Sequence, residues 1–511
     1  MLQLLTTRTS RESARQQITA LLRQHAEWLF VSNNGQSQAL RRSEIDVACA
    51  HNRLMLSCWT EKGTFSWRIL GWQWDGESLL LKASRRFGAE QPLLELVPRV
   101  SATAIASTIR AARQIRCERL AELARDWQPK STIERCGLSP GTRPGHPGRY
   151  ARILLRWRGE RIAVTGPVIT SNPSSVDAFL SSALLWFTRT RDRARTSFIE
   201  QLWLIVPGEL AKPACYRIAL LRESLRNVIK LLVVDDDLNA LTSLTCPERH
   251  ELWTKKLARF PPVPAATTSE QTRAILAEAP EAIDVVHSRH GETLRYFGLP
   301  FARVRSLLGV ERVWFGIDRS CRRLLDESSW REWQDLLCDL REHRSSTTCD
   351  HRHAFFRMAA EAWLESLLRR DITRLDPGLI IAPLHAQFRT AQSGKLGIRP
   401  IDLLALRQDG RLVVIELKAS EDREHVLQGA DYWRRVEAHR RRGHIAKAKL
   451  FGNKSIKDEP PLVYLVAPTL SVLPAFQTLA RCISSDIEIY RFDINEDWRS
   501  GVRVMRRMRV N

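Results

Sequence analysis

The chain has 511 residues, 44% of them hydrophobic, which is enough to build ordinary packed cores and argues against wholesale disorder. Lys and Arg number 79 against 57 Asp and Glu, a formal net charge of +22. This excess favours a polyanionic partner, although a generally Arg-rich proteome would give the same excess without a binding role. No apolar run approaches the ~20 residues needed to span a bilayer, so we expect no membrane segment. Ten scattered cysteines, with no Cys-x-x-Cys pair and no signal peptide, predict reduced thiols in a cytoplasm.

The first predicted domain, residues 1–127, is rich in short strands. Asn-Asn-Gly, Lys-Gly and Asp-Gly separate its apolar runs, a pattern typical of antiparallel strands. A basic helix follows at Ala102 to Arg125. Tryptophans interleaved with arginine are compatible with a platform for stacking bases, but more often they form the core of a small sheet. The tryptophans in question are Trp59, Trp67, Trp72 and Trp74.

Residues 128–149 are rich in proline and glycine and predict a linker. Residues 150–245 then alternate strands with helices, which predicts a small α/β layer with parallel pairing. Asp235, Asp236 and Asp237 end the last strand of this layer; a solvated acidic turn is the commoner reading, and a metal site at the strand ends is the alternative. Cys246 and His250 are a single Cys/His pair, and such a pair is more often incidental than a zinc site.

Residues 246–350 predict a mixed, largely helical segment to which the sequence assigns no chemistry. The last predicted domain, residues 351–511, begins with an apolar helix in which Glu361 and Glu365 are four apart and therefore share a face. We expect a first strand from Leu379 to Phe388, with Gln387 near its end.

The most informative stretch is 400–432. Gln408-Asp409-Gly410-Arg411 lies between two apolar runs and predicts a hairpin. The second strand, Leu412 to Leu417, is apolar enough to be buried on both faces, yet Glu416 and Lys418 stand together at its end. The hairpin can bring Asp402 close to Glu416, and two converging carboxylates suit a hard cation such as Mg²⁺.

Asp402 and the Glu416-Leu417-Lys418 tripeptide resemble the active site of the PD-(D/E)XK, or restriction-endonuclease-like, nuclease superfamily. The following helix, predicted from Arg423 to Arg442, carries Gln428 and Tyr432. These resemble the Gln-x-x-x-Tyr motif of the branch that includes recombination exonucleases. Glu-x-Lys alone is frequent by chance, but the whole run, in its predicted context, is much more specific than an exposed Glu–Lys pair on an edge hairpin. The resemblance covers about Ala354 to Phe492.

The resemblance implies a mixed α+β, multidomain α/β protein with an αβββαβ core in the last third, behind a small β-rich domain and a central α/β layer. It also implies a metal-dependent nuclease that hydrolyses phosphodiester bonds, with DNA as the expected substrate because no RNA-binding signature is present. The central layer could equally be a degenerate copy of the nuclease fold; it lacks Glu-x-Lys, so we expect no catalysis there.

The roles that the resemblance implies are these. Asp402, Glu416 and the carbonyl of Leu417 would bind Mg²⁺ or Mn²⁺, and Lys418 would hold the attacking water. Glu361 or Glu365 would join the metal site. Gln428 and Tyr432 would position the substrate backbone. Phosphate contacts would come from the arginines that continue the helix: Arg434, Arg435, Arg440, Arg441 and Arg442.

Two other classes of function stay open. The chain is then either a nucleic-acid-binding protein that retains a nuclease fold without catalysis, or an interaction protein whose N-terminal domains bind protein partners. In the second case the nuclease is accessory to the N-terminal part. An assay for DNA cleavage with Mg²⁺ or Mn²⁺ tests the first case, because tight, salt-sensitive binding without turnover in any metal would favour it.

Overall fold

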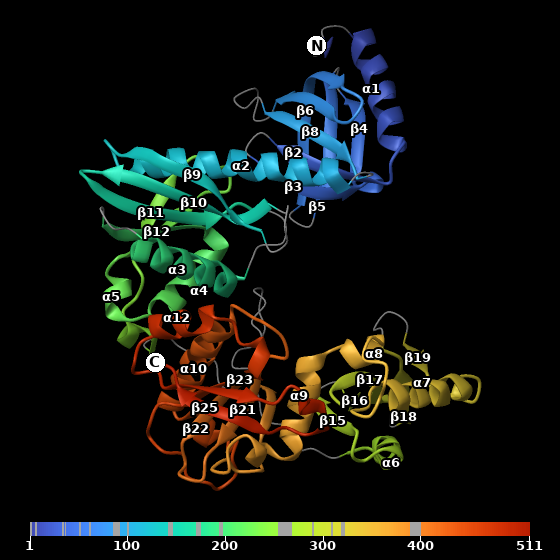
Figure 1. The fold of residues 1–511 in the computed structure, drawn as a ribbon. Helices are drawn as coiled ribbons and strands as arrows, with labels where there is room; N and C mark the ends of the chain where they lie inside the picture. Colours follow the sequence, from blue (N-terminus) through green and yellow to red (C-terminus); the bar gives the residue numbers. More distant parts are fainter. Residues whose placement is uncertain are drawn as a thin grey trace. The chain divides into compact units, whose positions relative to one another are not determined.

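The computed structural model describes the chain except residues 1–2, 6–7, 33–34, 36, 51–52, 61–62, 85–91, 100–101, 142–146, 170–174, 194–197, 254–267, 289–290, 308–309, 318–321 and 389–399. Its contacts divide it into two compact units, Met1–Cys215 with Ser224–Cys246, and Tyr216–Glu223 with Pro247–Asn511. The described residues form four sheets with helices packed on them, so the predicted mixed α+β, multidomain class is confirmed (Figure 1). None of the described helices is both long and apolar enough to cross a membrane.

Unit 1 begins with an antiparallel sheet in the order β3-β2-β8-β7-β6-β5-β4, with β1 paired to β6. Helix α1 (Arg8–Arg23) packs its apolar face on this sheet. Trp67 and Trp72 lie in the core between them, whereas Trp59 is exposed. The strands are β1 (Gln3–Leu4), β2 (Glu27–Ser32), β3 (Ser37–Arg41), β4 (Ile45–Ala50), β5 (Arg53–Thr60), β6 (Gly63–Trp74), β7 (Leu79–Ser84) and β8 (Leu93–Pro98).

The second sheet of unit 1 has the order β14-β13-β12-β11-β10-β9. Helix α2 (Ala102–Trp127) covers one face through Leu120 and Ala124, and α3 (Val176–Arg193) packs against β11 and β12. The strands are β9 (Thr132–Pro140), β10 (Pro147–Trp157), β11 (Glu160–Pro167), β12 (Ile199–Pro207), β13 (Ile229–Val234) and β14 (Leu241–Leu244), with α4 (Gly208–Ile218) and α5 (Glu223–Arg226) between β12 and β13.

The prediction of a linker over residues 128–149 is wrong. Most of the described residues in this range belong to strand β9 or to the start of β10, which pair with each other. Proline and glycine are concentrated at the end of β9 and the start of β10, while Thr132 and Ile133 are β-branched residues that favour a strand.

Unit 2 contains an antiparallel sheet in the order β15-β16-β17-β18-β19, here called the accessory sheet. Helices α6 (Glu270–Glu278) and α7 (Trp330–His343) complete its core through Ile275 and Trp333. The strands are β15 (Ile283–Ser288), β16 (Gly291–Tyr296), β17 (Leu299–Leu307), β18 (Val310–Phe315) and β19 (Arg323–Leu324).

The prediction of a largely helical segment over residues 246–350 is therefore also wrong. Phe297 and Gly298 both have positive φ angles and form the tight turn between β16 and β17. A turn of this kind joins antiparallel strands and is not compatible with a continuous helix.

The last sheet, here called the C-terminal sheet, has the order β20-β21-β22-β23-β24-β25. Helices α8 (Ala354–Arg357) and α9 (Ala360–Arg370) precede it, α10 (His425–Arg441) and α11 (His444–Lys447) follow β22, and α12 (Ala475–Cys482) follows β23. The predicted αβββαβ order is confirmed. The strands are β20 (His385–Phe388), β21 (Ile401–Leu406), β22 (Leu412–Leu417), β23 (Leu462–Pro468), β24 (Ile489–Ile494) and β25 (Val504–Arg509). Strand β20 is shorter than the predicted Leu379–Phe388.

Every residue of β22 is buried, as its unbroken apolar run predicts. Helix α9 lies on one face of the C-terminal sheet through Trp363 and Leu364, and α10 lies on the other through Tyr432 and Val436. A Cβ atom on Gly429 would stand 2.6 Å from a Leu465 methyl group, so glycine at this position lets α10 approach β23 closely.

Candidate active site

Asp402 and Glu416 lie opposite each other where β21 begins and β22 ends. Leu403 pairs with Ile415 in the antiparallel ladder, which sets Asp402 across from Glu416 one step further along. The chain then leaves the sheet at Lys418 and enters α10 at His425. The hairpin thus brings together the three residues that resemble the nuclease motif.

Lys418 is surrounded by acidic groups. Its Nζ lies 3.0 Å from Glu416 Oε1, 3.3 Å from Asp422 and 3.9 Å from Glu361. Lys418 is 6% exposed and Glu416 only 2%. The Oδ2 of Asp402 accepts a hydrogen bond of 2.9 Å from the backbone N–H of Leu417. The single buried ammonium group of Lys418 therefore lies close to three carboxylates.

The pKa shifts reflect this crowding. Burial raises the pKa of Glu416 well above its ordinary value, and the nearby Asp402 raises it further. Burial also raises the pKa of Asp402, although the Leu417 N–H and Lys418 oppose the shift. Burial lowers the pKa of Lys418, but Glu416, Glu361 and Asp422 outweigh it and the net shift is upward. The surroundings thus disfavour the charged forms of Asp402 and Glu416 and favour the charged form of Lys418.

A hard cation fits this donor set. Glu416 Oε2 is buried and has no hydrogen-bond partner among the described residues. In the part of the chain that the structure describes, no three or more His, Cys, Asp or Glu side chains are grouped so that they could hold a metal ion. Asp402 and Glu416 therefore offer two carboxylates, and the remaining ligands would be a backbone carbonyl and water, as is usual for Mg²⁺.

The sequence offers either Glu361 or Glu365 for the metal site, and the structure places these two residues differently. Glu361 is near Lys418 at the rim of the site. Glu365 is 1% exposed and lies behind the site, where Gln387 Nε2 donates to it at 2.7 Å and the guanidinium of Arg295 donates to it at 3.1 Å.

Gln387 connects Glu365 to the site. Ala386 pairs with Leu403 and Phe388 with Ile401, so the register of the ladder sets Gln387 across from Asp402, and the φ of Gln387 is +49°. A residue other than glycine in this left-handed region is strained, and such strain is often found at functional sites. Gln387 is close enough to Asp402 to stabilise its charged form.

The result is a chain of polar contacts from the accessory sheet to the site. Arg295 on β16 binds Glu365 on α9, and Gln387 on β20 lies between Glu365 and Asp402. Asp284 on β15 binds Arg295 at 2.7 Å and also pairs with Arg369 of α9. The orientation of Asp402 thus depends on residues of a second sheet.

Gln428 and Tyr432 both lie on the buried side of α10. Gln428 is 2% exposed; its Nε2 donates to Glu424 at 3.2 Å and its Oε1 has no partner among the described residues. Tyr432 is 5% exposed, and the guanidinium of Arg435 lies 4.5 Å from its ring centre. Burial and Glu416 raise the pKa of Tyr432, so the phenol stays protonated.

The arginines of α10, predicted to contact phosphate, lie against acidic side chains and carbonyl oxygens, and the phosphate contacts stay a prediction. Arg434 and Arg435, with Arg217, form ion pairs with the buried Asp431. These three arginines outweigh burial and hold the pKa of Asp431 below its usual range. The remaining arginines are occupied too: Arg440 and Arg441 pair with Glu437, and Arg442 donates to the carbonyls of Ala438 and Trp253. These ion pairs and hydrogen bonds join α10 to other segments of unit 2, which contribute Arg217 and Trp253.

Sequence reasoning missed Asp422 and His425 at the site, and Arg295 behind it. Asp422 is only four residues after Lys418, so the sequence could have indicated that the two side chains are close. His425 Nε2 lies 3.2 Å from the Glu416 carbonyl oxygen, and burial followed by Lys418 lowers its pKa to about 4, so it is neutral at pH 7. Arg295 is 70 residues from Glu365, and no local pattern joins them.

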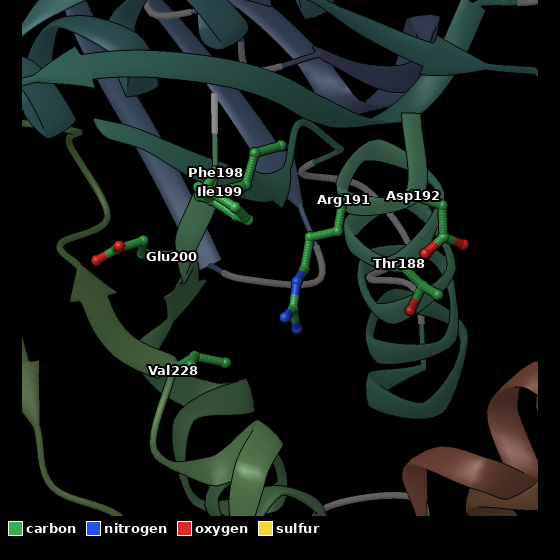
Figure 2. Close-up of a pocket in the computed structure, with 7 residues that line it drawn as sticks. All are labelled: Thr188, Arg191, Asp192, Phe198, Ile199, Glu200 and Val228. Atoms are coloured by element: carbon green, nitrogen blue, oxygen red, sulfur yellow. The ribbon is translucent and has the colours of Figure 1, made fainter. Parts of the chain in front are cut away.

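A separate pocket of about 560 Å³ lies in unit 1, beside the N-terminal ends of β12 and β13. Figure 2 shows the guanidinium of Arg191 pointing into the space between α3 and β12. Asp192, Glu200 and the exposed Phe198 also line it, so its charges are mixed. No residue predicted for the nuclease site lies there.

No protein-family model and no curated protein matches the chain. Among solved structures, it is similar to an XisH family protein from Nostoc punctiforme PCC 73102, with 20% identity, a TM-score of 0.18, and coverage of 25% of this chain and 98% of that one. It is also similar to an fdxN element excision controlling factor protein from Anabaena variabilis, with 19% identity, a TM-score of 0.17 and the same coverages. A third similarity is to Archaeoglobus fulgidus Pelota, with 10% identity, a TM-score of 0.12, and coverage of 46% of this chain and 56% of that one. TM-scores this low support no inference about fold or activity.

The contact between Arg295 and Glu365 can be tested by a double-mutant cycle. Arg295→Met should lower the free energy of unfolding by about 3–5 kcal/mol, because it leaves the buried Glu365 without its cation. Arg295→Met with Glu365→Gln should cost clearly less, because the uncompensated charge is removed too. Denaturant unfolding of the wild type, both single variants and the double variant measures the coupling. Additive costs would show that the two residues do not interact.

Proposed function

We propose that unit 2 is a nuclease that hydrolyses phosphodiester bonds in DNA with the help of Mg²⁺ or Mn²⁺. The observation that carries this proposal is the buried pair Asp402 and Glu416 beside Lys418, in which Glu416 Oε2 has no hydrogen-bond partner. Structural ion pairs in a core normally satisfy every oxygen, so a carboxylate oxygen left in this state suits a cation. The same residues carry the resemblance to the PD-(D/E)XK motif.

The chain's own residues would divide the work as follows. Asp402 and Glu416, with the carbonyl of Leu417, hold the cation. When bound, such an ion lowers the pKa of a water molecule and neutralises the non-bridging phosphate oxygens. Lys418 is protonated in its acidic surroundings, so it orients the attacking water as a hydrogen-bond donor and balances the phosphate charge. It does not remove the proton.

The surrounding residues would position these groups. The Leu417 N–H fixes one oxygen of Asp402, and Gln387 holds the other side of that carboxylate near Glu365. Gln428 and Tyr432 are almost fully buried on the face of α10 that packs on the sheet. They would therefore support the site from that face and would not offer open phosphate contacts. This replaces the substrate-positioning role predicted for them from the motif.

The proposal predicts that Asp402→Ala or Glu416→Ala abolishes cleavage. Each change removes a carboxylate that holds the ion, whereas the fold should survive because a source of repulsion is removed as well. The assay mixes purified protein with linear, circular, nicked and single-stranded DNA, and with RNA, in Mg²⁺, in Mn²⁺ and in a chelator.

The matched control for that assay is Asp409→Ala. Asp409 is a half-exposed carboxylate at the other end of the same hairpin. It should leave cleavage unchanged. Wild-type turnover by Asp402→Ala would refute the assignment. Salt-sensitive DNA binding without turnover in any metal would favour a binding protein that retains the fold.

Lys418 should affect turnover but not metal affinity. Lys418→Ala removes the ammonium beside the water, and we expect turnover to fall about 10²- to 10³-fold. Lys418→Arg should rescue little, because a planar guanidinium does not replace a compact ammonium in this buried space. Titration calorimetry with Mn²⁺ should show that both variants still bind the ion. Affinity that is lost with Ala and restored with Arg would contradict this division of roles.

A further inference from the structure

Two pairs of cysteine side chains lie in contact within unit 1. The Sγ atoms of Cys117 and Cys136 are 3.4 Å apart, and those of Cys215 and Cys246 are 3.1 Å apart. All four are thiols in the structure. A disulfide has an S–S distance of about 2.05 Å, so a small movement of the two side chains would bring either pair to bonding distance.

The fold fixes the positions of Cys117 and Cys136. Cys136 lies on β9, where it pairs with Ile153 of β10 in the antiparallel ladder. Residues paired in this way share a face of the sheet, and the face of Ile153 is the one that packs on α2. Cys117 is a residue of α2 in the same core. The two cysteines are 19 residues apart in the sequence, so the packing of α2 on β9 brings them together.

The two thiols differ in exposure and in acidity. Cys117 is fully buried, whereas Cys136 is partly exposed. A hydrogen bond from Cys117 lowers the pKa of the Cys136 thiol, although burial and the nearby Glu118 oppose the shift. The same hydrogen bond, and burial, raise the pKa of Cys117. A partly exposed thiol that ionises readily, beside a second thiol, is the arrangement typical of cysteines that form reversible disulfides.

The pair of Cys215 and Cys246 differs in this respect. Cys246 is the more exposed member, and its hydrogen bond with Cys215, together with burial, raises the pKa of Cys246. The thiol that solvent reaches is therefore the one that ionises less readily. This contrast favours Cys117 and Cys136 as the pair that an oxidant in solution attacks first.

We propose that Cys117 and Cys136 form a reversible disulfide when the protein meets hydrogen peroxide. The Cys136 thiolate attacks one peroxide oxygen, the O–O bond breaks, and hydroxide leaves and takes up the proton that Cys136 had released. The sulfur is then a sulfenic acid. The Cys117 sulfur attacks it, the S–S bond forms, the S–O bond breaks, and the departing hydroxide takes the Cys117 proton.

In sum, two thiols and one hydrogen peroxide give one disulfide and two water molecules. The two sulfurs lose the two electrons that the peroxide oxygens gain. A dithiol reverses the bond by thiol–disulfide exchange and is itself oxidised to a disulfide.

The bond would join two elements that organise unit 1. Strand β9 is the edge of its sheet, where it pairs with β10. Helix α2 packs on that sheet through Leu120 and Ala124, and on the first sheet through Ala112. A bond between Cys117 and Cys136 would therefore fix the edge strand to the helix that both sheets share. It uses no residue of the proposed nuclease site, so it stands or falls independently of the proposed function.

The test treats the reduced full chain with hydrogen peroxide, blocks the remaining thiols with iodoacetamide under denaturing conditions, and digests the protein with trypsin. Arg119 and Arg135 lie between the two cysteines, so trypsin places them in different peptides. Mass spectrometry should find these two peptides joined, and dithiothreitol should separate them again. The unfolding temperature of the oxidised protein should rise, because the bond restricts the unfolded chain.

Two variants test the order of the steps. Cys117→Ser removes the second thiol, so Cys136 should stop at the sulfenic acid, which dimedone labels. Cys136→Ser should leave Cys117 reduced, because Cys117 is buried and ionises less readily. Cys338→Ser is the matched control: it removes an exposed thiol on α7 and should leave the joined peptides unchanged.

Peroxide treatment that leaves both Cys117 and Cys136 open to iodoacetamide would overturn the inference. A bond confined to Cys215 and Cys246 would overturn it too. Both results come from the wild type, so misfolding of a variant does not affect them. Equal dimedone labelling of Cys136 with and without Cys117 would contradict the role given to Cys117.

Discussion

The structure of unit 2 depends on one costly arrangement, two carboxylates buried side by side at the end of a fully buried strand. Burial and mutual repulsion both disfavour the charged forms of Asp402 and Glu416. Lys418 offsets part of that cost, and the Leu417 N–H offsets a further part. A fold selected only for stability would replace such a group with apolar residues, because buried ion pairs contribute little net stability. Its presence is best explained by a ligand that supplies the missing positive charge.

The rest of the domain holds this arrangement in place. Gln387, the buried Glu365 and Arg295 of the accessory sheet form a polar support behind Asp402. On the other side, Gly429 lets α10 approach the sheet, and the arginines of α10 are bound by Asp431 and Glu437. The accessory sheet therefore supports the candidate site and is not an appendage to it.

Sequence reasoning predicted the parts of this site that depend on local order. The hairpin, the buried strand and the helix follow from 33 consecutive residues, and strand register alone brings Asp402 opposite Glu416. It failed where long-range contacts decide the outcome. Strand pairing, not composition, sets β9 and the start of β10 in one sheet and β15 to β19 in another. Helical spacing places Arg434 and Arg435 near Asp431, three and four residues after it, but does not show that Asp431 and Arg435 are buried. The contact of Arg295 with Glu365 had no sequence signal.

The central claim is that Asp402 and Glu416 form a cation site whose charge costs stability when the ion is absent. Thermal unfolding of the wild type and of Asp402→Asn, each with and without Mn²⁺ at neutral pH, tests this most directly. The pKa of Asp402 is raised on folding, so its charge opposes folding above that pKa, and Asn should leave the ion-free protein at least as stable. Mn²⁺ should raise the unfolding temperature of the wild type, by mass action, but not that of Asp402→Asn. Equal stabilisation of both proteins by Mn²⁺, or a marked loss of stability in ion-free Asp402→Asn, would contradict the account.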